Sequence, residues 1–225
     1  MDYALNPYSG CAHGCVYCYA PEVTHAKWEE WRVPKAKMNI ARRLSIELPN
    51  VRGIIGIGTV TDPYQPAESE LELTRQCLRV LKEQGFRIHM HTKSDLILRD
   101  IDLLSEMEGT VGITVTGIGE RESKMTEPGA PMPSRRLETI RRLVDAGIDV
   151  YALVGPVLNH LEGKEEAFVS ALADTGVKLI YIDSLNSRPL LSERLSRMRF
   201  RGSPSAEQRI KELAQAAGIE VRPVF

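Results

Sequence analysis

The chain has 225 residues and 29 basic against 30 acidic side chains, which gives a net charge of -1 at pH 7. Because the two signs nearly balance, the overall charge does not attract the protein to nucleic acid or to a membrane surface. The length is sufficient to bury a large core without disulfides, so we expect a single domain over residues 1–225 whose cysteines are free for chemistry. Because the sequence shows no leader and no apolar run of about 18 residues, we expect a cytoplasmic protein with no membrane segment.

The first part of the chain predicts a short strand that leads into a cysteine-rich loop. The strand is expected at residues 3–6, and the loop at residues 6–20. Trp28 and Trp31 have the spacing of one helical face, and we interpret them as packing residues rather than as a platform for substrate. An amphipathic helix is expected from Met38 to Leu48, where Pro49 ends it.

Strands and helices alternate along the rest of the chain. The predicted strands are residues 53–60, 86–92, 111–116, 149–154, 178–183 and a short last one at 219–222. The predicted helices are residues 71–84, 100–106, 134–146, 164–174 and 205–217, and the Pro- and Gly-containing residues 117–133 are expected to form a loop. This alternation predicts an α/β fold with a parallel sheet and a site at the carboxyl ends of its strands.

Three of the four cysteines, Cys11, Cys15 and Cys18, lie within eight residues. Three thiolates on one loop can bind three corners of a [4Fe-4S] cubane and leave the fourth iron without a protein ligand. A structural zinc site needs a fourth donor. Cys77 falls in a predicted helix, and His13 lies between two of the thiols, where joint ligation is awkward. We therefore favour a cluster with one open iron, and a non-catalytic zinc or iron-sulfur protein is the alternative.

The spacing Cys11-x3-Cys15-x-Tyr17-Cys18 resembles the signature of the radical SAM superfamily. The resemblance implies a partial (β/α)6 barrel of parallel strands, with a [4Fe-4S] cluster and S-adenosylmethionine (SAM) as cofactors. It also implies that one electron from the cluster cleaves SAM to a 5′-deoxyadenosyl radical, which abstracts hydrogen from a substrate. An electron donor such as flavodoxin or ferredoxin is the partner that this chemistry requires.

Three further segments resemble the spore photoproduct lyase-like branch of that superfamily. They are Asn-Pro-Tyr-x-Gly-Cys at residues 6–11, Thr-Asp-Pro-Tyr-Gln at 61–65 and Thr-Lys-Ser at 92–94. In the lyase of this branch, a cysteine that returns hydrogen to the product occupies the place where this sequence has Thr61 and Asp62. We therefore expect a reaction other than thymine-dimer repair.

The resemblance assigns roles to individual residues. Cys11, Cys15 and Cys18 are expected to bind the cluster, with Tyr17 near the adenine. The other cofactor-binding positions follow successive strands: Thr61 and Asp62 for the methionine amino group, Lys93 and Ser94 for the carboxylate, Thr114 or Thr116 for the ribose, and Val154 and Pro156 for the adenine. Tyr17 and Tyr19 match the tyrosines of a radical relay in the lyase, and with Lys93 they form the expected catalytic set.

Histidines and arginines give weaker signals about the substrate. His89 and His91 share one face of a strand, and we interpret them and His160 as buried residues with local hydrogen bonds, with substrate contact as the alternative. Two groups of arginines are interpreted as solvated surface: residues 135, 136, 141 and 142, and residues 194, 197, 199 and 201. The first hypothesis for the substrate is a nucleic acid or a nucleotide-like molecule, and a small metabolite or a partner protein is the alternative.

Overall fold

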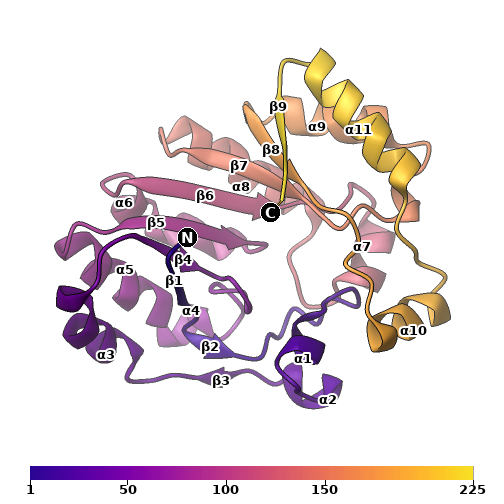
Figure 1. Ribbon diagram of the computed structural model, residues 1–225. Helices are drawn as coiled ribbons and strands as arrows, with labels where there is room; N and C mark the ends of the chain where they lie inside the picture. The colour runs from indigo at the N-terminus through magenta and orange to yellow at the C-terminus, as the bar shows by residue number, and fades with distance from the viewer. Residues whose placement is uncertain (225) are drawn as a thin grey trace.

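The computed structural model describes residues 1–224, except for the side chain of Asn50, and its centre is a seven-stranded sheet in which every neighbouring pair is parallel. The strands lie side by side in chain order (Figure 1). They are β1 (Tyr3–Leu5), β4 (Ile54–Ile57), β5 (Arg87–Thr92), β6 (Gly109–Thr114), β7 (Val150–Val154), β8 (Leu179–Ile182) and β9 (Glu220–Pro223). The two short strands β2 (Tyr8–Ser9) and β3 (Lys35–Ala36) pair antiparallel in a separate ribbon.

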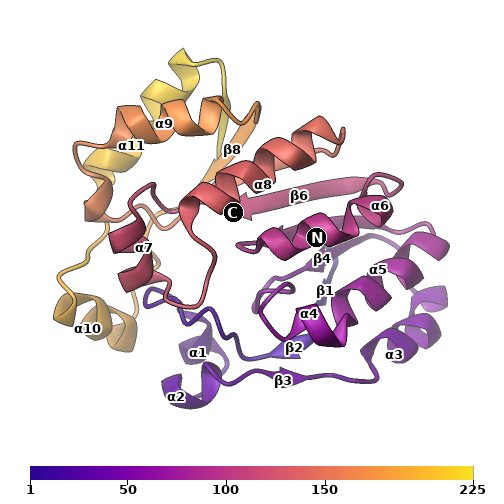
Figure 2. The same cartoon turned by 180° about the vertical axis from the view of Figure 1, so that it is seen from behind.

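Helices follow the strands and cover one face of the sheet, as Figure 2 shows for α5, α6 and α8. The helices between strands are α3 (Ile40–Glu47), α4 (Glu68–Leu71), α5 (Leu73–Glu83), α6 (Ile101–Leu104), α7 (Glu120–Thr126), α8 (Pro133–Asp145), α9 (Glu165–Ala173), α10 (Pro189–Arg197) and α11 (Pro204–Ala216). Two single-turn helices, α1 (Ala20–Val23) and α2 (Trp28–Trp31), follow the cysteine loop. No helix within residues 1–224 is both long enough and apolar enough to cross a membrane.

The alternation of side chains along each strand decides what faces the helices and what faces the open side of the sheet. In β5, Ile88 and Met90 are buried in the main hydrophobic core. Because successive side chains of a strand point to opposite faces, His89 and His91 lie on the other face. His91 is therefore on the side of the sheet where the cysteine loop lies, and it lines one cavity with the cysteines.

The prediction of a parallel α/β fold of the partial-barrel type is confirmed, and β9 extends the sheet to a seventh strand. The expectation of a loop over residues 117–133 is wrong in part, because α7 forms within it. Residues 120–126 contain neither proline nor glycine, and two acidic residues in the first turn of α7 favour a helix start there.

Two predicted helices are shorter than expected. The helix predicted at residues 71–84 is broken at Glu72, whose φ of 49° lies in the left-handed region and separates α4 from α5. The helix predicted at residues 100–106 is reduced to α6, because the 3-10 helix η2 (Asp95–Asp100) occupies the preceding turn. Two further 3-10 helices are η1 (Leu48–Asn50) and η3 (Asn159–Leu161).

Candidate active site

A cavity of about 420 Å³ lies at the carboxyl ends of β4 to β8, where the cysteine loop crosses them. Its volume falls within the range of roughly 300–1,000 Å³ that is usual for small-molecule sites. Ten of the residues that the sequence pattern singled out line it: Cys11, Cys15, Tyr17, Cys18, Tyr19, Thr61, Asp62, Lys93, Thr114 and Pro156. The fold thus brings together residues that are up to 145 positions apart in the sequence.

The three thiols of the loop line this one cavity. Gly14, with a φ of 58°, provides the turn between Cys11 and Cys15, and the Cys18 amide donates a hydrogen bond of 2.9 Å to the Cys15 carbonyl. Within residues 1–224, no group of three or more His, Cys, Asp or Glu side chains could hold a single metal ion. In a cubane each thiolate binds a different iron atom, so a cluster site does not require the three sulfurs to converge on one point.

Burial makes the free thiols poor acids. It raises the pKa of Cys11 to about 11, and it also raises the pKa of Cys15 and of Cys18. A buried thiolate needs a cation beside it, and bound iron supplies that charge and releases the proton. The donor set therefore fits a [4Fe-4S] cluster with one iron left open.

The segment after β4 holds the cysteine loop from one side. The Gln65 amide group is fully buried: its Oε1 accepts from the Ala12 amide at 2.9 Å, and its Nε2 donates to the Gly10 carbonyl at 3.2 Å. The Thr61 hydroxyl donates to the Tyr8 carbonyl at 3.2 Å. Both side chains fix the backbone on which Cys11 is carried.

Asp62 is bonded by protein groups on both carboxylate oxygens. Its Oδ1 accepts from the Thr92 hydroxyl at 2.6 Å and from the Tyr64 amide at 2.9 Å, and its Oδ2 accepts from the Lys93 amide at 2.8 Å. The Nδ1 atom of His13 lies 3.3 Å from Oδ2. Although burial opposes ionisation, His13 and these hydrogen bonds hold the pKa of Asp62 well below its ordinary value. The predicted contact of Asp62 with the amino group of SAM stays a prediction.

Lys93 provides a cation inside the cavity. Its ammonium group lies 5.6 Å from the centre of the Tyr17 ring. Burial lowers the pKa of Lys93, but the Cys15 and Glu127 side chains outweigh this effect, so the net change is upward. A charged ammonium at this place is chemically suited to a carboxylate, as the sequence predicts for SAM.

Behind the loop, Tyr17 is joined to a buried ion pair that the sequence analysis missed. The Tyr17 hydroxyl donates to Glu127, and Glu127 Oε2 lies 2.6 Å from Nη2 of Arg136. Arg136 also donates to the carbonyls of Pro131 at 2.7 Å and of Thr114 at 3.3 Å. Both charged side chains are 0% exposed. The interpretation of Arg136 as solvated surface is wrong, because helix α8 turns this side chain inward.

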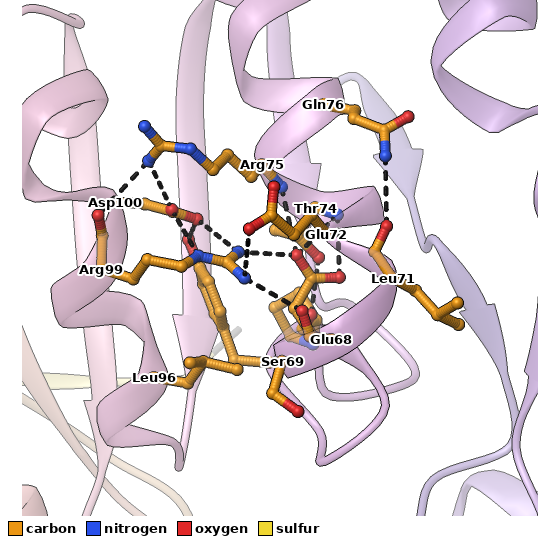
Figure 3. A network of polar contacts seen from close by, with 12 residues as sticks. Glu68, Ser69, Leu71, Glu72, Thr74, Arg75, Gln76, Leu96, Arg99 and Asp100 are labelled. Atoms are coloured by element: carbon orange, nitrogen blue, oxygen red, sulfur yellow. Dashed lines mark hydrogen bonds and ion pairs between the residues drawn. The ribbon is translucent and has the colours of Figure 1, made fainter.

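A second buried network supports the start of the cysteine loop, and Figure 3 shows part of it. The Tyr8 hydroxyl donates to Glu68 at 2.6 Å, and Arg99 lies 2.8 Å from Glu68. Arg99 also lies 2.8 Å from Asp100, which is in turn 2.7 Å from Arg75. Glu68 and Asp100 are fully buried, so this chain of charges links β2, α4, α5 and η2 in one fixed arrangement.

Three of the predicted cofactor residues are not among those lining the cavity. The Ser94 hydroxyl accepts from the Leu96 amide at 3.2 Å and begins the 3-10 helix η2. Val154 is fully buried in the main core. The carbonyl of Thr116 lies 3.2 Å from Nε2 of His160. The predicted contacts of Ser94, Val154 and Thr116 with SAM remain untested.

The histidines of β5 differ in their surroundings. His89 contacts the hydroxyls of Thr110 and Tyr151, both at 2.9 Å, so it has the local hydrogen bonds that we expected. His91 lines the cavity, where burial and the charge of Lys93 lower its pKa to about 4. Asp183, which follows β8, also lines the cavity and was missed by the sequence analysis. Its position directly after a strand is the signal that could have found it.

Six of the eight arginines that we interpreted as solvated surface are exposed, as expected: residues 135, 141, 142, 197, 199 and 201. Arg135 pairs with Asp95, and Arg141 lies 2.7 Å from Glu138. Arg194 is half-buried, and its guanidinium lies 3.8 Å from the centre of the Trp28 ring.

Comparison with known proteins agrees with this geometry. Residues 5–172 match the family described as the radical SAM superfamily. The chain belongs to this superfamily. Radical SAM proteins are enzymes that use a [4Fe-4S] cluster and SAM, and these are the cofactors of this chain. They also need a reductant.

An uncharacterized protein of Methanocaldococcus jannaschii is 32% identical over 164 residues, which are 71% of this chain and 61% of that protein. This radical SAM chain therefore spans less than two thirds of the length of that relative. A structure of spore photoproduct lyase with bound AdoMet and dinucleoside spore photoproduct superposes with a TM-score of 0.70 at 13% identity, over 97% of this chain and 75% of that one. Streptococcus suis SuiB bound to its precursor peptide gives a TM-score of 0.67 at 10% identity, over 99% of this chain and 48% of that one. These two likenesses concern the fold.

Proposed function

We propose that Cys11, Cys15 and Cys18 bind the [4Fe-4S] cluster of this radical SAM enzyme and that the cavity beside them binds SAM. The observation that carries the proposal is that the three thiols and the Lys93 ammonium line one cavity at the carboxyl ends of parallel strands. The bound cofactors supply the chemistry, which is one-electron cleavage of SAM to a 5′-deoxyadenosyl radical that abstracts hydrogen from the substrate.

The residues of the chain orient SAM in this proposal. Lys93 faces the carboxylate of SAM, while Thr114 and Pro156 lie along the adenosine portion. Thr114 is the better candidate for the ribose than Thr116, because Thr114 lines the cavity. Tyr17, held by Glu127, forms a fixed wall that limits how SAM enters between the cluster and the strands.

For the substrate we propose a nucleic acid or a nucleotide-like molecule, because the spore photoproduct lyase that shares this fold binds a dinucleoside. A partner protein is the second candidate. It is favoured by the pairing of Arg135, Arg141 and Arg197 with nearby carboxylates, which removes cations that a phosphate backbone would need. The electron donor that we propose is a flavodoxin or a ferredoxin.

Anaerobic reconstitution with iron and sulfide tests the central proposal. After reduction, we expect the electron paramagnetic resonance spectrum of a cubane, a change of that spectrum on adding SAM, and formation of 5′-deoxyadenosine. The Cys15→Ala variant is expected to lose the cluster and SAM cleavage together. Cys77→Ala is the matched control, because Cys77 is a buried thiol of the main core, away from the cavity.

Two outcomes would count against the central proposal. A wild-type protein that takes up zinc and gives no cubane spectrum would support the non-catalytic alternative. A Cys15→Ala protein that keeps a full cluster would refute the ligand assignment.

A separate experiment tests the proposed substrate. If it is a nucleic acid, binding of a DNA or RNA oligonucleotide should weaken steeply as the salt concentration is raised from about 50 to 200 mM. A protein that binds neither DNA nor RNA would favour a partner protein as the substrate.

A further inference from the structure

Helix α10 covers the outer side of the cysteine loop. It lies outside residues 5–172, which match the superfamily, and Figure 1 shows it beside α1 and α2 at the end of the molecule where that loop lies. Leu191 and Leu195 of α10 are buried in a small second core with Cys15, Val16 and Tyr17. The helix is therefore part of the surroundings of the proposed cluster.

Arg194 is the polar contact between α10 and the loop. Its Nε donates to the Val16 carbonyl at 2.6 Å and its Nη2 donates to the Cys18 carbonyl at 2.7 Å. The guanidinium plane is also held over Trp28, 3.8 Å from the ring centre. One planar fork thus fixes the carbonyls on both sides of Tyr17, a geometry that a lysine ammonium does not reproduce.

The positive charge of Arg194 also reaches the cysteine loop. Its guanidinium donates to the carbonyl of Cys18, one of the proposed cluster ligands, so the charge lies close to the proposed cluster. Reduction of a cluster adds negative charge, so a nearby cation stabilises the reduced form. Net charge, hydrogen bonding and solvent exposure are the features that set cluster potentials.

We propose that Arg194 is a positioning residue that holds the cluster loop against α10, raises the reduction potential of the cluster and shields it from solvent. This inference rests on the proposed binding of the cluster by Cys11, Cys15 and Cys18. It assigns a function in the reaction to a segment outside the matched residues.

The test is a redox titration of the reconstituted protein, followed by electron paramagnetic resonance, with the rate of cluster bleaching in air as a second measurement. For Arg194→Gln we expect the ratio of reduced to oxidised cluster at a fixed potential to fall about tenfold, which corresponds to about 59 mV for one electron. We also expect faster bleaching. Arg197→Gln is the control, because Arg197 lies one turn away, is 77% exposed and pairs with Glu193.

Arg194→Lys separates the two effects. The lysine keeps the positive charge but loses the paired hydrogen bonds of the planar guanidinium. We therefore expect a cluster reduction potential near that of the wild type and faster bleaching of the cluster in air. If both Arg194 variants match the wild type in potential and in bleaching, the inference is overturned. If Arg194→Gln does not fold, the bleaching rate of Arg194→Lys decides, and an unchanged rate overturns the inference. A wild-type protein that binds no cluster would overturn the proposed function as well, so the two failures are distinguishable.

Discussion

The ion pair between Glu127 and Arg136 gives the sharpest prediction for the stability of the site. Replacing Arg136 by Met leaves the Glu127 carboxylate without its cation in a place where both residues are 0% exposed. Breaking one partner of a buried pair costs about 3–5 kcal/mol, because an uncompensated charge remains. Because a domain has only about 5–15 kcal/mol of stability, this loss is large.

Urea denaturation of the cluster-free protein at pH 7 measures the effect. Arg135→Met is the control, because Arg135 is 66% exposed and its pairing with Asp95 should contribute no more than about 1 kcal/mol. The double variant Glu127→Gln/Arg136→Met removes both charges, so we expect it to be more stable than Arg136→Met alone.

The pH dependence provides an independent check. In the wild type, burial would raise the pKa of Glu127, but the charges of Arg136 and Lys93 prevail and lower it from 4.5 to about 2. The stabilisation is therefore complete above about pH 4.5 and is lost as the pH falls toward 2. Without Arg136 the carboxyl takes up a proton more readily, so the stability gap between Arg136→Met and the wild type should narrow as the pH falls from 7 to 4. A difference in the free energy of unfolding between wild type and Arg136→Met below about 1 kcal/mol at pH 7, or one that does not change with pH, would refute this reasoning.

Two further predictions concern the cavity and its loop. Gln65→Glu places a charge between the Gly10 carbonyl and the Ala12 amide. We expect the free energy of unfolding from urea denaturation to fall by about 1–3 kcal/mol, and less iron to be bound on reconstitution. Gln76 is exposed, so the control variant Gln76→Glu should match the wild type. His91 has its pKa lowered from 6.5 to about 4 by burial and by Lys93, against an opposing effect of Asp62, so the unfolded chain binds more protons between these values. The stability of the wild type should therefore fall by up to about 3 kcal/mol more than that of His91→Gln between pH 6.5 and 4, and equal slopes would contradict this.

The order of strands and helices could be predicted because buried strands carry an unbroken apolar signal. The run that became β4 is an example, and most strand boundaries differ by only a few residues. Helix α7 could not be predicted, because prolines on its carboxyl side and glycines on its amino side hide a seven-residue stretch of ordinary helix formers. The break at Glu72 likewise has no local signal, because it follows from the buried contacts of Glu68 with the Thr74 and Arg75 amides.

Most of the predicted site residues that follow strands or lie in the cysteine loop line one cavity, and their predicted contacts with the cofactors stay predictions. Val154, which we expected near the adenine, is buried in the core, while its neighbours Leu153 and Gly155 line the cavity, as strand alternation requires. Its predicted contact stays a prediction.

Glu127 and Arg194 were outside the reach of sequence analysis, because sequence patterns of charged residues do not distinguish a solvated side chain from one that packing turns inward. Tertiary packing sets the contacts of Glu127 with Tyr17 and of Arg194 with the Val16 and Cys18 carbonyls.

The hydrogen bonds from Gln65 and Thr61 to the cysteine loop have a consequence for how the cofactor is acquired. A free loop would have to be ordered when iron binds, at a cost of about 1–2 kcal/mol for the backbone of each residue. Here the folded protein already holds the loop through its own side chains, so that entropy is lost during folding. In the proposed cluster site the thiols are therefore a preorganised set, and the binding energy of a cluster would not be consumed in arranging them.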